Sequence, residues 1–460
     1  MERKSKPFGL SDKLGYMFGD FGNDFTFLLS TTFLMKFYTD IMGVSAAVVG
    51  AMIMLARFLD AFTDVAMGQI ADRSKPRKKG KFLPWIKRMS IPVSIASFLM
   101  YANWFRDMPM GFKVFWMFLS YVLWGSVFYT SINIPYGSMA SAISGEPKDR
   151  AQLSNWRTVG ATLAGVFVGA VLPLLVYLED ANGNQVLSGN RMVIGALVCS
   201  ILSVVCYMLC YHMVTERVKI DQKKEKFNLK DLLGGLIRNR ALIGIILASV
   251  ALLLTQFTLQ GMSTYIYPNY FRNIAAQSVA GLVSLPVILI LAIFTVKLSE
   301  KYGRKALAIA GSLYGAVMLL VTYFLRTRNA WVFVGMYALI YVGLGLFSMI
   351  SWAMITDVID DTQVRTGERS DGTIYAVYSF ARKLGQAAAS GLTGVLLTMI
   401  GYSQATQFDE PVVNGIYNVT CLVPAIGFVL VAIILKFLYP LSKKRVEENA
   451  RILAEGRGNE

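Results

Sequence analysis

Two aspartates stand one helical turn apart in the apolar stretch ARFLDAFTDVAMG, residues 56–68. Because Asp60 and Asp64 are four residues apart, a helix places both carboxylates on one face, with Thr63 beside them. Carboxylate and hydroxyl oxygens are hard ligands that suit a cation such as Na⁺. They also suit a proton, because two close carboxylates in a low-dielectric place resist joint ionisation. The spacing therefore predicts a site for a cation or a proton.

Arg57 lies one turn before Asp60 and is predicted as its charge partner. The alternative interpretation of these residues is a purely structural Arg–Asp cluster that holds helices together. Two acids with one base leave one carboxylate without a basic partner, which favours the cation or proton site.

The composition indicates a polytopic membrane protein. The chain has 460 residues, of which 55% are hydrophobic and 16% charged, and its mean hydropathy is +0.50. A soluble domain carries about 25% charged residues. Apolar runs such as residues 196–214 and 241–259 are each near the ~20 residues that a helix needs to cross a bilayer. These runs lack the strict alternation of β-barrel spans, so helices are predicted.

The net charge of +16 is explained by the orientation of the chain in the membrane rather than by nucleic-acid binding. Basic residues gather in two segments, 72–88 and 215–240, whereas the segments 40–45, 178–191 and 403–412 contain almost none. That asymmetry distinguishes cytoplasmic from external loops. With the basic N-terminus and tail, it predicts that both termini lie in the cytoplasm. No cleavable signal peptide is expected, and His212 is expected to be an interfacial residue.

The apolar runs predict an all-α membrane protein with twelve transmembrane helices in two pseudo-symmetric six-helix halves. The expected spans are roughly 14–38, 46–71, 83–104, 112–142, 152–178, 192–213, 241–270, 276–299, 305–325, 330–360, 370–401 and 413–438. The predicted domains are a bundle at 1–214, a cytoplasmic linker at 215–240, a bundle at 241–438 and a cytoplasmic tail at 439–460. Paired halves with basic loops at 71–81 and 299–306 resemble the major facilitator superfamily, in which substrates bind near the midplane. A twelve-helix bundle of another architecture is the alternative.

Two further spans carry polar residues that are expensive in a bilayer, where an ionised side chain at the centre costs about 2.5–3.5 kcal/mol. Asp20 and Asp24 share a helix face. A helix-end position near the cytoplasmic surface is favoured for Asp20, whereas Asp24, a turn deeper, is predicted to face a partner or a cavity. In the fourth span Thr130, Asn133 and Gly137 share a face, and Asn133 can donate and accept bonds to hydroxyl groups. A polar helix–helix contact explains that face equally well.

Basic residues inside the fifth and eleventh spans need acidic partners or ligands. Arg157 stands two turns inside its span, and its fork of donors suits a carboxylate or a pair of sugar hydroxyls. Arg382 and Lys383 are adjacent, so they point in different directions, and one of them is expected to face the cavity.

Several motifs together resemble one family, the glycoside–pentoside–hexuronide:cation symporters of the major facilitator superfamily. They are FGNDF, ARFLDAFTDVAMG, KGKFLPW, NIPYGSMA, SFARKLGQ and the GRK loop, and they cover nearly the whole chain. The resemblance implies uptake of a sugar, glycoside or hexuronide together with Na⁺, Li⁺ or H⁺ by alternating access. It implies no cofactor beyond the coupling ion, a lipid bilayer as the surroundings and function as a monomer.

The resemblance also implies residue roles. The cation site falls on Asp60, Thr63, Asp64 and Thr130. The sugar site falls on Asp24, Asn133, Arg157 and Lys383, with Asn23 and Gly137 nearby. Melibiose-type members have an acid in place of Asn133, and the Asn133 pattern is that of glucuronide- and xyloside-type members, so a sugar acid is better tolerated. Thr63 replaces an asparagine that helps to bind Na⁺ in the melibiose type, so Na⁺ and H⁺ both stay open.

Other functions fit the sequence less well. An intramembrane hydrolase would draw its aspartate pair from two facing helices, whereas Asp60 and Asp64 share one helix and no nucleophile–base set accompanies them. A channel is disfavoured because the polar residues are scattered and no pore loop repeats. The closer alternative is a related cation-coupled facilitator for a lysolipid or other amphiphile, which would have an apolar cavity.

Overall fold

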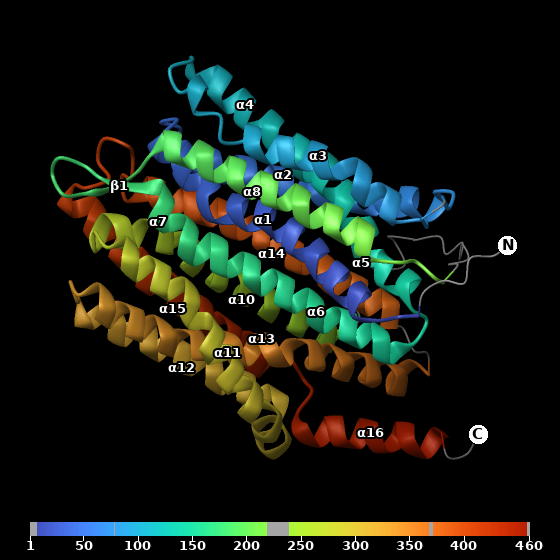
Figure 1. Cartoon of the computed structure of the whole chain (residues 1–460). Helices are drawn as coiled ribbons and strands as arrows, with labels where there is room; N and C mark the ends of the chain where they lie inside the picture. Colours follow the sequence, from blue (N-terminus) through green and yellow to red (C-terminus); the bar gives the residue numbers. More distant parts are fainter. Residues whose placement is uncertain (1–6, 78, 219–238, 368–370, 458–460) are drawn as a thin grey trace. The chain divides into compact units, whose positions relative to one another are not determined.

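A computed structural model of the chain describes residues 7–77, 79–218, 239–367 and 371–457 (Figure 1). Most of the predicted linker, residues 219–238, lies outside the described residues. In the described ranges the chain is helical apart from one short β-hairpin, which confirms the predicted all-α class.

The helices before the linker follow the predicted apolar runs. They are α1 (Leu10–Asp40), α2 (Ala46–Arg73), α3 (Leu83–Leu99), η1 (Asn103–Phe105), α4 (Met110–Val122), η2 (Leu123–Tyr129), α5 (Thr130–Ile143), α6 (Pro147–Val166), η3 (Phe167–Val171), α7 (Leu172–Val176) and α8 (Gly189–Met213). Strands β1 (Tyr177–Glu179) and β2 (Gln185–Leu187) pair antiparallel between α7 and α8, with Tyr177 opposite Leu187. The segments α4, η2 and α5 form one continuous helical run, in which η2 is a π-helix.

The helices after the linker are long and mostly uninterrupted. They are α10 (Arg240–Tyr265), η4 (Ile266–Tyr270), α11 (Ile274–Tyr302), α12 (Arg304–Leu325), α13 (Ala330–Thr366), α14 (Asp371–Met399), α15 (Glu410–Phe437) and α16 (Lys443–Arg457).

Within the described ranges, nine helical segments are long and apolar enough to cross a membrane. The other three predicted spans coincide with α1, α3 and α14. Helix α3 is 17 residues long, and α1 and α14 carry charged side chains inside their apolar runs. The count of twelve spans therefore stays a prediction.

The chain folds as two compact units. The first contains residues 1–225 together with 397–407, and the second contains residues 226–396 together with 408–460. The segment 397–407, which connects α14 to α15, thus belongs to the first unit although both helices lie mainly in the second. The domain boundaries predicted at residues 214, 240 and 438 stay predictions.

Helix α1 is central to the first unit, where it lies against α6 and α8 (Figure 1). The approach of α6 is very close at Gly160, because a Cβ atom there would lie 2.4 Å from the backbone oxygen of Met17. Glycine is therefore required where α6 crosses α1. In the second unit, α12 packs against α13 and α15, and α10 packs against α15.

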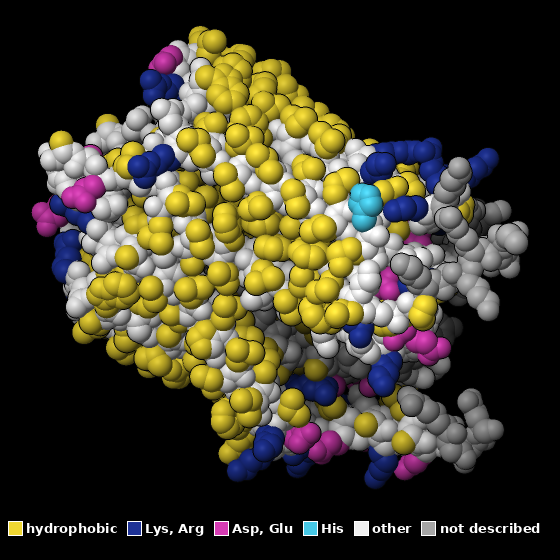
Figure 2. All heavy atoms as spheres, in the orientation of Figure 1, with side chains coloured by type: hydrophobic (Ala, Val, Ile, Leu, Met, Phe, Trp, Pro, Cys, Tyr) yellow, Lys and Arg dark blue, Asp and Glu magenta, His cyan; other side chains and the backbone are white. Residues whose placement is uncertain are grey.

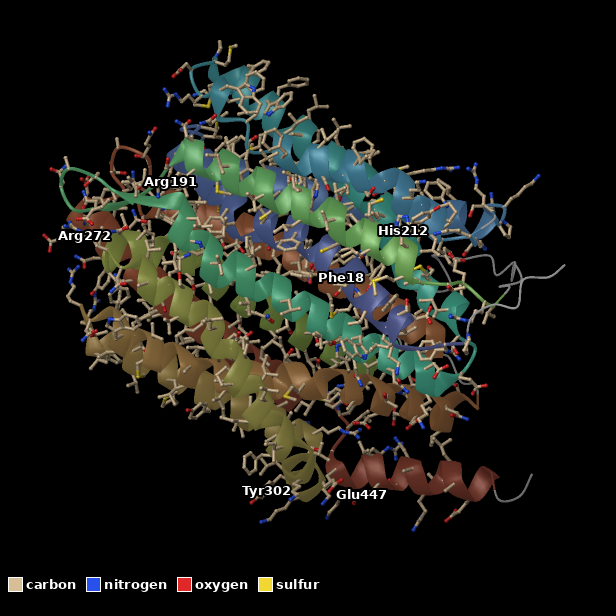
Figure 3. All side chains as sticks on the ribbon, viewed as in Figure 1. Phe18, Arg191, His212, Arg272, Tyr302 and Glu447 are labelled. Carbon is tan, nitrogen blue, oxygen red and sulfur yellow. The ribbon has the colours of Figure 1, made fainter. Side chains whose placement is uncertain are left out.

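Apolar side chains cover the outward faces of the helices. On α8, Ile194 and Ile201 are more than half exposed, and Figure 2 shows such side chains in yellow, with charged side chains gathered near helix ends. Arg191 lies near the beginning of α8 and His212 near its end (Figure 3). His212 is exposed, as expected of an interfacial residue.

A carboxylate anchors the segment that follows α8. Glu216 accepts hydrogen bonds from the backbone N–H groups of Lys81, Phe82 and Leu83 at 2.7–2.9 Å. Burial raises the pKa of Glu216, and the three hydrogen bonds oppose that rise because they stabilise the charged form. The start of the linker is thereby held against the loop between α2 and α3.

A second buried charge cluster joins the end of α1 to the segment 397–407. Lys36 Nζ lies 2.8 Å from Asp40 Oδ2. The Tyr402 hydroxyl accepts from Lys36 Nζ at 2.6 Å and donates to Asp40 Oδ1 at 2.8 Å. Tyr402 therefore completes the hydrogen bonding of a buried ion pair.

We expect Tyr402→Phe to destabilise the protein by about 1–3 kcal/mol, because it leaves two buried charged groups with one partner fewer. The measurement is the thermal unfolding midpoint of the purified protein in detergent. Tyr323→Phe is the matched control, because Tyr323 makes ring contacts but its hydroxyl makes no hydrogen bond to the described residues. Equal midpoints for the two variants would contradict this role of Tyr402.

Candidate functional site

The two predicted carboxylates of α2 each meet a hydroxyl from the neighbouring helical run. Asp60 Oδ1 accepts a hydrogen bond from Ser126 Oγ at 2.5 Å. Asp64 Oδ1 accepts one from Thr130 Oγ1 at 2.7 Å. Both partners are four residues apart, so two parallel acid–hydroxyl pairs connect α2 to η2 and α5. Of the four residues predicted for the cation site, the structure thus brings Asp64 and Thr130 into contact across two helices, and Asp60 contacts Ser126.

The π-helical backbone of η2 positions these hydroxyls. Such segments are short insertions that recur at functional sites. The carbonyl of Gly125 accepts bonds from both the backbone N–H and the hydroxyl of Thr130. A Cβ atom at Gly125 would lie 3.2 Å from Asp60 Oδ1, so glycine at this position allows the carboxylate to approach η2 closely.

Thr63 and Arg57 lie on the same helix as Asp60, within one turn of it. The Thr63 hydroxyl donates to the backbone carbonyl of Asp60 at 3.1 Å, so its lone pairs stay available. Among the described residues, the Nε atom of Arg57 is buried without a hydrogen-bond partner. Its guanidinium carbon lies 5.1 Å from the centre of the Phe27 ring on α1, which is a cation–π contact. The role of Arg57 as the charge partner of Asp60 stays a prediction.

A second set of polar residues joins α1 to α5 and α8. Tyr207 on α8 donates to Asn23 Oδ1 at 2.8 Å. Asn23 Nδ2 lies 3.5 Å from Asn133 Oδ1, the outer limit of a hydrogen bond. Asn23 is buried, whereas Asn133 is half-buried. The buried side-chain amide of Asn23 is therefore fixed by Tyr207 of α8 and points toward Asn133.

Asp20 supplies the acidic partner that Arg157 requires. Arg157 Nε donates to Asp20 Oδ1 at 2.9 Å, and the Arg157 side chain is 45% exposed while that of Asp20 is 6% exposed. The guanidinium also lies over the Tyr136 ring, 5.6 Å from its centre. The favoured interpretation of Asp20 as a helix-end carboxylate is wrong, because Asp20 is buried inside α1 and is paired with Arg157 of α6.

Two predicted sugar-site residues are left open to a ligand. The carboxylate of Asp24, one turn from Asp20, makes no hydrogen bond or ion pair to the described part of the chain. A Cβ atom at Gly137 would meet nothing within 4 Å. An acceptor and an open backbone position are the features expected of a site that receives hydroxyl groups.

Lys383, the remaining residue predicted for the sugar site, lies in the second unit. Lys383 is half-buried on α14. Its neighbour Arg382 bonds the Tyr378 hydroxyl at 3.4 Å and lies 5.4 Å from the centre of a Trp352 ring. That one of these two basic side chains faces a cavity stays a prediction.

Sequence reasoning missed Ser126, Asp20 and Tyr207 as members of these clusters. For Ser126 a signal exists, because it precedes Thr130 by the same four residues that separate Asp60 from Asp64. For Tyr207 no sequence signal exists, because its partner Asn23 is 184 residues away. In the described ranges no three His, Cys, Asp or Glu side chains converge, so any cation held here would rest on two carboxylates and nearby hydroxyls.

Comparison with known proteins identifies the family. The model of the family described as MFS/sugar transport protein matches residues 15–443. An uncharacterized symporter of Bacillus subtilis is 29% identical over 444 residues, which cover 96% of this chain and 94% of the relative. A glucuronide carrier protein homolog of Escherichia coli is 30% identical over 446 residues, which cover 95% of this chain and 93% of the relative. The crystal structure of the nucleoside transporter NupG matches with a TM-score of 0.65 at 15% identity, over 94% of this chain and 100% of that one.

The chain belongs to the MFS/sugar transport protein family. It is a multi-pass membrane transporter and not an enzyme, and its fold is the major facilitator fold. The resemblance inferred from the motifs is thereby confirmed.

Glycines 137 and 160 offer a direct test of which glycine faces open space. We expect the Gly137→Ala protein to have the same thermal unfolding midpoint as the wild-type protein, because the new methyl group meets nothing within 4 Å. Gly160→Ala should lower stability by about 1–3 kcal/mol, because it forces α6 away from α1. Thermal unfolding in detergent measures both, and a destabilised Gly137→Ala protein would show that this position is packed.

Proposed function

We propose that this protein is a symporter that takes up a sugar, glycoside or hexuronide coupled to Na⁺ or H⁺ by alternating access. The observation that carries the proposal is the pair of acid–hydroxyl contacts between α2 and the η2–α5 run. Two carboxylates held one turn apart favour occupation by a cation or proton, because occupation relieves their mutual repulsion. One relative is named a symporter, which supports the coupling of sugar uptake to a cation.

One helix connects the proposed ion site to the proposed sugar site. Thr130, Asn133 and Gly137 all lie on α5, at intervals of three and four residues. A cation bound at Asp60 and Asp64 draws α2 against α5 and fixes the direction in which Asn133 points. Sugar binding then stabilises the same arrangement. Coupling of this kind is reciprocal, so each ligand raises the affinity for the other by the same factor.

The substrate would be recognised by groups of both charges. Asp24 and Asn133 accept and donate bonds to hydroxyls. Arg157 is paired with Asp20 through Nε, and its half-exposed guanidinium keeps further donors for a hydroxyl or a carboxylate. Asn133 in place of an acid favours a sugar acid, and the relative named as a glucuronide carrier homolog agrees with this choice. Lys383 is proposed as the contribution of α14.

Alternating access is part of the proposal because the sequence predicts two halves, and transporters built from such repeats change access when one repeat moves against the other. We place the protein in the inner membrane of a bacterium, with both termini in the cytoplasm and with one chain as the functional form. Occupation of both ion and sugar sites permits the change of access, whereas occupation of one site alone does not.

We expect Asp60→Asn and Asp64→Asn to abolish coupled uptake, lowering it at least tenfold, because neither amide can carry the charge that a cation neutralises. The measurement is sugar uptake into proteoliposomes under an imposed Na⁺ gradient, and separately under an imposed pH gradient. Asp107→Asn is the matched control, because this carboxylate is 87% exposed and pairs only with the adjacent Arg106 among the described residues. Coupled uptake that survives in both α2 variants would overturn the proposal.

A counterflow screen distinguishes the substrate classes. Vesicles preloaded with glycosides, pentosides or uronic acids should exchange at least one of these sugars. Exchange of a lysolipid with no sugar exchanged would instead favour the facilitator for amphiphiles.

A further inference from the structure

We propose that Ser126 is a member of the coupling-cation site, where its hydroxyl alternates between bonding Asp60 and serving the bound cation. The inference rests on the proposed function and deepens it. No residue at this position was predicted from the motifs, and the contact appears only in the structure: Ser126 Oγ donates to Asp60 Oδ1 at 2.5 Å. The pairing repeats that of Thr130 with Asp64 one turn further along.

The bonding of Ser126 differs from that of nearby serines. Ser131 donates to the carbonyl of Val127 at 2.6 Å, and Ser138 donates to that of Ile134 at 3.0 Å. Both therefore bond four residues back within their own helix, which is the usual arrangement for serine in a helix. Ser126 is buried at 4% exposure and instead directs its hydroxyl across to α2.

The local backbone supports this direction. Ser126 lies inside the π-helical segment η2, directly after Gly125. A side chain at Gly125 would crowd the Asp60 carboxylate, because its Cβ would lie 3.2 and 3.4 Å from the two oxygens. The residue before Ser126 thus leaves space for the carboxylate, and Ser126 supplies the donor that meets it.

A hydroxyl can serve both states of the site because it has one donor hydrogen and two acceptor lone pairs. When no cation is bound, the hydrogen stabilises the ionised Asp60. When Na⁺ or Li⁺ is bound, the oxygen can turn a lone pair to the cation and join the carboxylates as a hard ligand. When a proton binds Asp60, the carboxyl group is neutral and depends less on the donor.

Loss of the hydroxyl consequently has opposite effects on the two kinds of cation. For Na⁺ or Li⁺ a ligand is lost, so the concentration that gives half-maximal uptake rises. For H⁺ the ionised carboxylate loses a donor, so the proton concentration that gives half-maximal uptake falls. A hydrogen bond to a charged group is strong enough that either shift should be about tenfold. The direction of the shift therefore reports which cation the site uses.

The test compares Ser126→Ala with Ser126→Thr and Ser131→Ala in proteoliposomes. Uptake of the sugar selected by counterflow is titrated with Na⁺, with Li⁺ and with H⁺. We expect Ser126→Ala to shift half-saturation about tenfold for the cation that drives uptake. Ser126→Thr, which keeps the hydroxyl, and Ser131→Ala, whose hydroxyl bonds only its own helix among the described residues, should stay within about twofold of wild type.

Each outcome decides the inference. If Ser126→Ala does not fold, Ser126→Cys replaces it, because a thiol is of similar size but is a weak donor and a poor ligand for hard cations. Half-saturation that is unchanged for all three cations overturns the role of Ser126. If Asp60→Asn and Asp64→Asn abolish coupling while Ser126→Ala leaves the half-saturating cation concentrations unchanged, only this inference fails. If those two variants keep coupling, the proposed function itself fails.

Discussion

An ionised carboxylate inside an apolar helix must be stabilised by other groups, and this constraint governs the first unit. Asp20 pairs with Arg157, Asp40 with Lys36 and Tyr402, Asp60 with Ser126, and Asp64 with Thr130. The first two carboxylates have basic partners and are structural by that criterion. The two on α2 are each met by a hydroxyl from the neighbouring helical run, and these are the carboxylates proposed above for the coupling cation.

Asp24 differs from all four of these carboxylates. It has no hydrogen bond or ion pair within the described ranges, and it lies one turn from the Asp20–Arg157 pair. That pair is neutral as a unit, so Asp24 contributes an uncompensated acceptor beside a half-exposed guanidinium. The sugar proposed above would offer hydroxyl donors to this acceptor.

Helix α5 carries residues from both proposed sites, that for the cation and that for the sugar. Its N-terminal end carries Thr130, which bonds Asp64, and the next turns carry Asn133 and Gly137. Because a helix is stiff over two turns, a change in how α2 meets Thr130 alters the position of Asn133. Asn133 lies at the limit of hydrogen-bonding distance from Asn23, which Tyr207 holds in place. A weak contact beside a fixed group is suited to rearrangement when a ligand arrives.

The sequence alone determined the class of the protein and the order of its helices, because spans that bury their backbone in lipid must be long and apolar. It also identified Asp60 and Asp64 as a pair, because helical periodicity is local and places residues four apart on one face. Partners between helices were decided only by the tertiary structure. Ser126 and Thr130 have the same spacing as Asp60 and Asp64, but their contact with α2 appears only in the structure, and Asp20 meets Arg157 across 137 residues. Such contacts depend on how helices cross, and no spacing within one helix encodes that.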